Sequence, residues 1–153
     1  MSLKKGDTIP EFTLKDQHGN SFQITDLIGK KPIVLFFYPK DYTPGCTKEV
    51  CSFRDSFEEF TELGAEVVGI SSDSESSHRK FASTFNLPYV LLADTRKEVR
   101  RLFRIENSLF NLLPGRETYV VDLEGKVAMV FNSMSPAHHM TKALKALKSM
   151  KSA

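Results

Sequence analysis

The chain has 153 residues, of which 41% are apolar and 26% charged, and its formal net charge is +2 at pH 7. This length suffices for a single domain over residues 1–153 that buries a full core without a disulfide. The scattered charges and the short longest apolar run, Ile33 to Phe37, exclude a basic nucleic-acid arm and a membrane span. We expect a soluble, cytoplasmic protein, although removal of a transit peptide would leave an organelle open.

The first third of the chain predicts a hairpin, a buried strand and a long helix. Two extended segments flank the turn-rich KDQHGN, which predicts an N-terminal β-hairpin decorating the main sheet. PIVLFFY is a continuous β-rich run, typical of a strand covered on both faces. Apolar residues at steps of three and four then predict a helix that Gly64 ends. The expected ranges are 12–14 and 21–24 for the hairpin, 32–38 for the strand and 47–63 for the helix.

The rest of the chain alternates strands and helices before a second hairpin. Ser74 is the expected N-cap of one helix, and Thr95 with Glu98 has the spacing of a capping box on the next. The order βαβαβα followed by ββα predicts an α/β fold with a central mixed sheet flanked by helices. The expected elements are strand 66–72, helix 75–85, strand 89–94, helix 96–103, a hairpin around the turn 123–126, and a last helix from Pro136.

Both cysteines lie in YPKDYTPGCTKEVC, the segment that connects the predicted buried strand to the first long helix and begins that helix. A thiol attacks only as the thiolate, and the unpaired N–H groups of a first helical turn stabilise an anion. TPGC places Cys46 at that turn. From the residues alone, Cys46 could equally be a small buried apolar side chain at a helix start.

The spacing of Cys46 and Cys51 argues against a structural disulfide. Residues five apart in an ideal helix have Cα atoms about 8.6 Å apart, whereas a disulfide needs less than about 7 Å. Unwinding one or two turns would allow the bond, as expected of an attacking and a resolving cysteine. Taken by itself, Cys51 could also be a helix-face cysteine without a role.

The loop PKDYTPGC has the form P-x-x-x-T-x-x-C after a central apolar strand, and it resembles the peroxiredoxins. The second cysteine, five residues on, is similar to the branch named for bacterioferritin comigratory protein or peroxiredoxin Q. The resemblance runs from GDTIPEFTL through FFYPKDYTPGCTKEVCSFRD to LLPGRETYVVD and the last helix. It implies a thioredoxin-like fold and a cofactor-free thiol peroxidase that reduces hydrogen peroxide and organic hydroperoxides with electrons from thioredoxin or a similar dithiol.

The resemblance also implies roles for three residues of the loop. Cys46 would be the peroxidatic cysteine, which attacks the O–O bond and becomes a sulfenic acid. Thr43 would hydrogen-bond the peroxide oxygens, and Pro39 would pack over the sulfur and shield it. These residues would together form the substrate site.

Three further residues complete the implied site. Arg116, which without the resemblance would be a solvated strand-end residue, would stabilise the thiolate and the charge that builds as the O–O bond breaks. Glu49 would orient this arginine. Cys51 would attack the sulfenic acid and form an intramolecular disulfide. Because no cysteine follows Cys51, the cycle would be self-contained and a monomer could run it.

Two other signals receive no catalytic role. The histidines share no metal-like spacing with the thiols, and adjacent helical histidines point about 100° apart, so we expect no metal site. The apolar stretch 108–115 either packs on the domain or forms a lip beside Arg116 that contacts an alkyl hydroperoxide or the reductant. The histidines are His18, His78, His138 and His139, and the apolar residues of the stretch are Leu109, Phe110, Leu112 and Leu113.

Two functions of other classes remain open from the residues. A thioredoxin-like disulfide oxidoreductase would share the fold class, but its thiols would be expected in C-x-x-C. A redox-regulated binding protein or chaperone would use the Cys46–Cys51 pair to unfold a helix and change a partner surface. Peroxide-driven turnover separates the peroxidase from both.

Overall fold

The computed structural model describes residues 2–105 and 115–152 of the chain. The strands are β1 Thr13–Asp16, β2 Ser21–Gln23, β3 Ile33–Phe37, β4 Glu66–Ser71, β5 Val90–Ala93, β6 Glu117–Val121 and β7 Val127–Asn132. The helices are α1 Pro44–Asp55, α2 Phe57–Glu62, α3 Glu75–Thr84, α4 Glu98–Leu102 and α5 His139–Ser152, with a short 3-10 turn at Ile24–Asp26.

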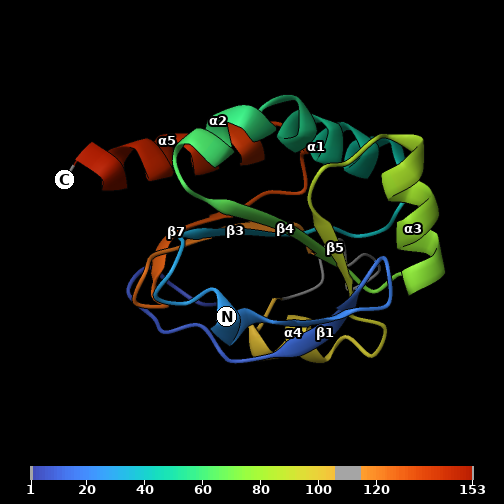
Figure 1. Ribbon diagram of the computed structural model, residues 1–153, viewed down its shortest axis with the longest axis horizontal. Helices are drawn as coiled ribbons and strands as arrows, with labels where there is room; N and C mark the ends of the chain where they lie inside the picture. The colour runs from blue at the N-terminus through green and yellow to red at the C-terminus, as the bar shows by residue number, and fades with distance from the viewer. Residues whose placement is uncertain (1, 106–114, 153) are drawn as a thin grey trace.

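The strands form one mixed sheet in the order β2-β1-β5-β4-β3-β6-β7. The pairs β3–β4 and β4–β5 are parallel, and the remaining pairs are antiparallel. Helices α1, α2 and α5 lie over one face of the sheet, and α4 lies on the opposite side (Figure 1). The predicted α/β class, with a central mixed sheet flanked by helices, is confirmed.

The continuous apolar run of β3 serves two cores, one on each face of the sheet. Val34 and Phe36 pack with residues of α1, α2, α3 and α5. Leu35 and Phe37 point the other way and pack with residues of α4 and the N-terminal segment. Because successive side chains of a strand alternate between faces, a strand covered on both sides has to be apolar throughout. This strand, central in the sheet, carries the cysteine loop at its carboxyl end.

The N-terminal hairpin is an integral part of the sheet, so its prediction as a decoration is wrong. Strand β1 pairs with β5 as well as with β2, through Lys15 opposite Ala93 and Asp16 opposite Leu92. Without the hairpin, β5 would be an edge strand with a row of unpaired N–H and C=O groups. Strand β1 pairs with these groups and so covers that edge.

The single helix predicted over 47–63 is wrong at its start and in its middle. Helix α1 begins at Pro44, whose missing N–H and preset φ suit the first helical position. The helix then breaks at Ser56, which leaves helical geometry at ψ 10° before α2 begins. Because the start is earlier than predicted, Cys46 is the third residue of α1.

Of the three remaining helix starts, that of α3 agrees with expectation and those of α4 and α5 differ. Ser74 caps α3 as predicted, because its hydroxyl accepts from the N–H of Ser77 at 3.1 Å. The expected capping box at α4 is wrong, since the carboxylate of Asp94 instead accepts from the N–H groups of Val99 and Arg100. The last helix begins at His139 and not at Pro136. Within the described ranges, no helix is both long enough and apolar enough to cross a membrane.

Candidate active site

Cys46 lies in the first turn of α1, as its third residue, and is fully buried. The first helical hydrogen bond runs from the N–H of Thr47 to the carbonyl of Thr43, at 2.8 Å. The N–H groups of Gly45 and Cys46 precede this bond and belong to the unpaired set at a helix start. The sulfur therefore sits at the end of a helix where an anion is stabilised.

Arg116 connects the sulfur to a buried carboxylate. Its Nη2 donates to Sγ of Cys46 at 3.5 Å, and its Nη1 donates to Oε1 of Glu49 at 2.6 Å. Its Nε donates to the carbonyl of Met134 at 2.9 Å, which fixes the plane of the guanidinium. Arg116 is 4% exposed and Glu49 is fully buried, so water screens neither charge. The structure thus brings together Cys46, Arg116 and Glu49, three residues that sequence reasoning selected.

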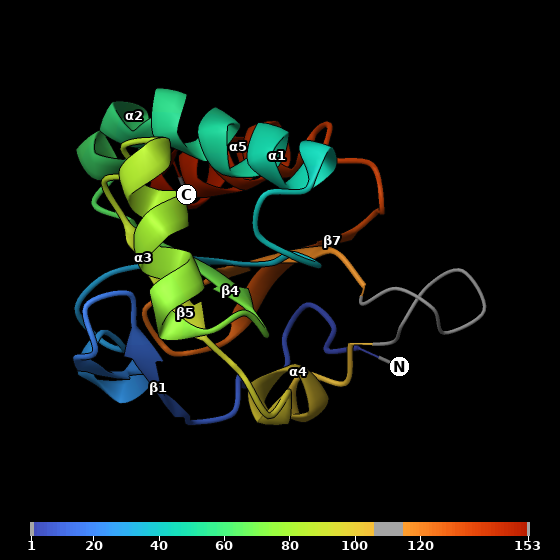
Figure 2. The same cartoon turned by 90° about the vertical axis from the view of Figure 1, so that its right-hand side faces the viewer.

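Close packing at the helix start holds the guanidinium in place. A Cβ added at Gly45 would lie 3.2 Å from Nη2 of Arg116 and 3.8 Å from the ring of Pro136. Pro136 belongs to the connection from β7 to α5, which passes beside the N-terminal end of α1 (Figure 2). Glycine at this position leaves just enough room for the arginine.

Among residues 2–105 and 115–152, no hydrogen-bond partner reaches the second oxygen of the Glu49 carboxylate, Oε2. Burial raises the pKa of Glu49 from 4.5 to about 7, and the charge and hydrogen bond of Arg116 oppose this rise. Nδ1 of His139 lies 3.5 Å from Oε2. Burial therefore favours the neutral form of this carboxyl group, and Arg116 favours the charged form.

His139 is a buried, neutral histidine behind the carboxylate. Burial lowers the pKa of His139 from 6.5 to about 4, with the carbonyl of Ser133 opposing the shift. Nε2 lies 2.9 Å from that carbonyl, which can only accept, so Nε2 carries the proton. Nδ1 then has a free lone pair and accepts from the hydroxyl of Thr118 at 2.8 Å.

Thr43 and Pro39 lie in the loop between β3 and α1 that leads to Cys46. Thr43 is the N-cap of α1, and its hydroxyl donates to the carbonyl of Lys40 at 2.8 Å. Its oxygen lone pairs are therefore left to accept a proton from elsewhere. Pro39 is half-buried in the loop after β3. The roles of both residues stay predictions.

A buried polar network anchors the loop between β3 and α1. Asp41 accepts hydrogen bonds from the hydroxyls of Tyr38 and Ser77 and lies 2.8 Å from Nδ1 of His78. Its backbone N–H donates to Asp73 at 2.8 Å. Asp41, Asp73 and His78 lie close enough together to hold a metal ion, and the contacts above already engage both oxygens of Asp41 and Nδ1 of His78. The network explains why the loop is held, and the expected absence of a metal stays a prediction.

Arg100 ties the two halves of the site together from the opposite face of the sheet. It donates to the carbonyl of Tyr38 at 3.1 Å and to the carbonyl of Gly115 at 2.6 Å. These carbonyls directly precede Pro39 and Arg116 in the chain. A single buried guanidinium therefore sets the separation between the cysteine loop and the arginine.

Cys51 is a free, half-buried thiol in the same unbroken helix as Cys46. Partial burial raises the pKa of Cys51, with Arg54 opposing and Asp55 adding to the rise. Both thiols are reduced, as the helical spacing requires. In the folded helix Cys51 is accordingly held as a thiol, at a distance from its partner.

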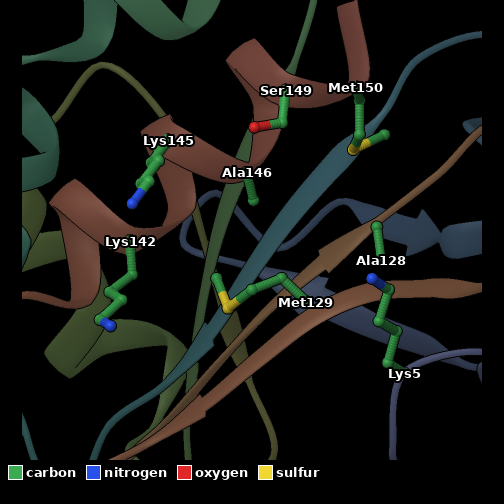
Figure 3. A pocket seen from close by; sticks show the side chains of 8 residues that line it. All are labelled: Lys5, Ala128, Met129, Lys142, Lys145, Ala146, Ser149 and Met150. Carbon is green, nitrogen blue, oxygen red and sulfur yellow. The ribbon is translucent and has the colours of Figure 1, made fainter. Parts of the chain in front are cut away.

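A groove along α5 is separate from the thiols. It lies between α5 and β7, and three lysine side chains rim an apolar floor (Figure 3). The lining residues are Lys5, Ala128, Met129, Lys142, Lys145, Ala146, Ser149 and Met150. The groove therefore does not contain the reacting sulfur.

Sequence reasoning missed His139, Arg100 and the Asp41 network. The sequence shows His138 and His139 side by side, and their spacing does not indicate which of the two side chains is buried. Arg100 lies in the helix expected over 96–103, whose sequence gives no sign that this side chain is buried. The apolar lip, with Leu109, Phe110, Leu112 and Leu113, lies outside the described residues.

Comparison with known proteins places the chain among cysteine peroxidases. The model of the AhpC/TSA family matches residues 5–130. Peroxiredoxin Q of Sedum lineare, a chloroplastic protein, is 51% identical over 150 residues, which cover 97% of this chain and 80% of the relative.

Two solved structures are similar over nearly their whole lengths. The peroxidoxin BcpB of Mycobacterium tuberculosis superposes with a TM-score of 0.90 at 41% identity, covering 97% of this chain and 98% of the other. Bacterioferritin comigratory protein of Xanthomonas campestris superposes with a TM-score of 0.86 at 28% identity, covering 94% and 99%. That relative is reported to have alkyl peroxide reduction activity.

Proposed function

We propose, because this chain belongs to the AhpC/TSA family of peroxiredoxins, that Cys46 is the sulfur with which it reduces hydroperoxides. The protein is a thiol peroxidase, and the family match confirms the resemblance of its loop motif. The observation that carries the assignment to Cys46 is its contact with Arg116 at the start of α1. The buried guanidinium supplies a fixed positive charge beside the sulfur.

In the first half of the cycle, the Cys46 thiolate attacks the outer oxygen of the peroxide. An S–O bond forms, the O–O bond breaks, and water or an alcohol leaves with one proton. Arg116 stabilises the thiolate and then the negative charge that develops on the leaving oxygen. Because the hydroxyl of Thr43 donates its proton to the backbone carbonyl of Lys40, its oxygen accepts the O–H of the peroxide and aims the O–O bond at the sulfur. Pro39 excludes water from the same place.

In the second half, Cys51 attacks the sulfenic acid of Cys46. The S–S bond forms and a water molecule leaves, so one peroxide is reduced for each pair of thiols. An intact α1 holds the two sulfurs apart, so this step requires the helix to unwind locally. The raised pKa of Cys51 in the folded helix keeps it unreactive until then.

The disulfide is then reduced by a dithiol protein of the thioredoxin type, which fits the family. Hydrogen peroxide and organic hydroperoxides are the proposed substrates, supported by the alkyl peroxide activity named for the Xanthomonas campestris relative. Because both thiols lie in one helix, a monomer is sufficient for the cycle. Size-exclusion chromatography with light scattering on the reduced and oxidised protein tests the monomer.

An organellar location, which the sequence left open, fits the chloroplastic relatives. The cytoplasmic location stays a prediction. Fractionation of cells that express the tagged full-length protein decides between the two.

Rapid-mixing kinetics with mass spectrometry test the cycle. We expect the reduced protein to lose both free thiols with one equivalent of hydrogen peroxide, and to gain a Cys46–Cys51 disulfide. Cys46→Ser should abolish turnover, whereas Cys51→Ser should accumulate a sulfenic acid and fail to turn over with thioredoxin.

Three outcomes would contradict the proposal or part of it. Rapid reduction of protein disulfides with little reaction with peroxide would indicate an oxidoreductase, and slow oxidation without turnover would indicate a redox switch. Full turnover of Cys51→Ser through many cycles would remove Cys51 from the resolving role.

A further inference from the structure

Tyr42 holds the chain in a strained conformation just before the helix that carries both cysteines. Its φ angle is +66°, in the left-handed region that a bulky aromatic residue rarely adopts. Its ring lies against Phe81 of α3, with ring centroids 5.0 Å apart, and its hydroxyl oxygen lies 3.2 Å from that of Thr84. Because the residue is 49% exposed, these surface contacts hold a backbone conformation that the residue itself disfavours.

The residue before Tyr42 is fixed to the fold on several sides. The carboxylate of Asp41 accepts hydrogen bonds from the hydroxyls of Tyr38 and Ser77. The backbone N–H of Asp41 donates to the carboxylate of Asp73 at 2.8 Å. These three partners lie directly after β3, in α3 and after β4. Asp41 is therefore a fixed point from which the chain leaves toward α1.

The first turn of α1, which follows Tyr42, is weak because of its sequence. Thr43 is the N-cap, but its side chain makes no capping hydrogen bond, and its hydroxyl donates to the carbonyl of Lys40 instead. A capping side chain would stabilise the helix start. Gly45 lies in the same turn, and glycine is a poor helix former. The turn that carries Cys46 can therefore open at low cost.

Beyond both cysteines, Phe53 holds α1 on the sheet. Its ring is fully buried and stacks on Phe36 of β3, with ring centroids 4.4 Å apart. The ring also lies beside Phe60 of α2, with centroids 5.7 Å apart. Asp41 and Phe53 are thus the firm points on either side of the segment in which the two thiols must meet.

We propose that Tyr42 is the hinge about which α1 unwinds when the Cys46–Cys51 disulfide forms, with Asp41 as its fixed anchor and Phe53 as the far limit. The strain at Tyr42 is released as the segment unwinds, which favours closure of the disulfide. This inference rests on the proposed function and deepens its second half. Tyr42 is a positioning residue, because it acts through the path of Cys46 and not on the reacting atoms.

The bonds of the closing step balance without the hinge. The sulfur of Cys51 attacks the sulfur of the Cys46 sulfenic acid, the S–S bond forms and the S–O bond breaks. The leaving hydroxyl takes the proton of the Cys51 thiol and departs as water. The hinge sets only how often the two sulfurs meet. Its effect should therefore be on the rate of disulfide closure.

A matched pair of variants isolates the backbone strain from the ring contacts. Tyr42→Ala and Tyr42→Gly both lack the ring, but only glycine adopts the left-handed region without cost. The wound helix should therefore be more stable in Tyr42→Gly, and its disulfide should close about fivefold more slowly than that of Tyr42→Ala. Each reduced variant is mixed with one equivalent of hydrogen peroxide. Mass spectrometry of quenched samples follows the sulfenic acid and the disulfide separately.

Lys97 provides the control pair, because it is exposed and also left-handed, with φ +58°. Lys97→Ala and Lys97→Gly differ by the same relief of strain at a position outside α1. Urea unfolding should show the glycine variant to be the more stable of the two. Their disulfides should nevertheless close at equal rates. A difference in closure as large as that of the Tyr42 pair would show that closure follows overall stability, which overturns the hinge.

Amide hydrogen exchange, followed by NMR, locates the hinge in the wild type. In the folded helix the N–H of Thr47 donates to the carbonyl of Thr43 at 2.8 Å. We expect the amide of Thr47 to exchange about tenfold faster or more in the disulfide form than in the reduced form. The amide of Asp41, which donates to Asp73, should keep its protection in both forms.

The outcomes separate this inference from the proposed function. Equal closure rates of Tyr42→Ala and Tyr42→Gly overturn the hinge and leave the peroxidase intact. Loss of protection at Asp41 in the disulfide form shows that the anchor gives way, which also overturns the proposal. A wild type that forms no sulfenic acid, or no Cys46–Cys51 disulfide, contradicts the proposed function itself. If the Tyr42 variants do not fold, the exchange of Asp41 and Thr47 in the wild type still decides.

Discussion

Arg116 places its Nη2 atom 3.5 Å from Sγ of Cys46, although 70 positions separate the two residues in the chain. The pairing of β3 with β6 explains this contact. In that register Phe37 lies opposite Glu117, so the residue before β6 comes to the end of β3 from which the cysteine loop starts. Because a slip of one residue would turn these side chains to the other face, the sheet register sets the geometry of the site.

Replacing Arg116 by Lys should lower the rate constant for reaction with hydrogen peroxide by roughly 100-fold or more. A lysine keeps the charge, but its single ammonium cannot reach both Cys46 and Glu49 in fixed directions. Rapid mixing of the reduced variant with peroxide measures this constant. Arg101→Lys, at an exposed position of α4, is the control and should react like the wild type. An equally fast Arg116→Lys would show that charge alone suffices.

Gly45→Ala should separate activity from stability. A Cβ at this position would press on Nη2 of Arg116 at 3.2 Å and displace the guanidinium by a few tenths of an ångström. We expect the peroxide rate constant to fall by about tenfold, because catalysis depends steeply on such placement. Alanine is also the better helix former, by up to about 1 kcal/mol, so urea unfolding should show no loss of stability. Unchanged kinetics would mean that the arginine adjusts without cost.

Ser52→Ala should slow the formation of the disulfide without changing the reaction with peroxide. The Ser52 hydroxyl donates to the carbonyl of Glu49 at 2.7 Å, a contact that competes with regular helix structure. Alanine strengthens the helix by about 0.5 kcal/mol, so unwinding and disulfide closure should be about twofold slower. Mass spectrometry of quenched samples follows the sulfenic acid and the disulfide. Ser83→Ala on α3 makes the same change elsewhere and should have no effect on closure.

Glu49→Gln should gain stability relative to the wild type as pH rises. The pKa of Glu49 is about 7 in the folded protein, above its usual 4.5. The folded state therefore binds more protons than the unfolded state between these values, and the wild type loses stability as pH rises through this window. The slope is at most about 1.4 kcal/mol per pH unit. Gln has no such slope.

Urea unfolding of both proteins at about pH 5 and about pH 8 measures this difference. The lowered pKa of His139 produces the opposite slope, since unfolded histidine binds a proton between about 6.5 and about 4. That slope is common to both proteins and cancels in their difference. A difference in unfolding free energy that does not change with pH would contradict the raised pKa of Glu49.

The sequence by itself determined the features that depend on local spacing. The alternation of apolar segments predicted the order of strands and helices and the α/β class. Pro44 and Gly45 before Cys46 indicated a helix start at the thiol, and the interval to Cys51 excluded a disulfide in a folded helix. Backbone sterics and helical geometry act over a few residues, so they can be read directly from the chain.

Only the tertiary structure decided which distant side chains meet. The contact of Arg116 with Cys46 and Glu49 depends on the register of β3 and β6. The burial of His139, but not of the adjacent His138, depends on where α5 begins and how it packs. The proton affinity of Glu49 follows from that packing, because burial and neighbouring charges set it. These effects depend on positions in space, which residue spacing along the chain does not specify.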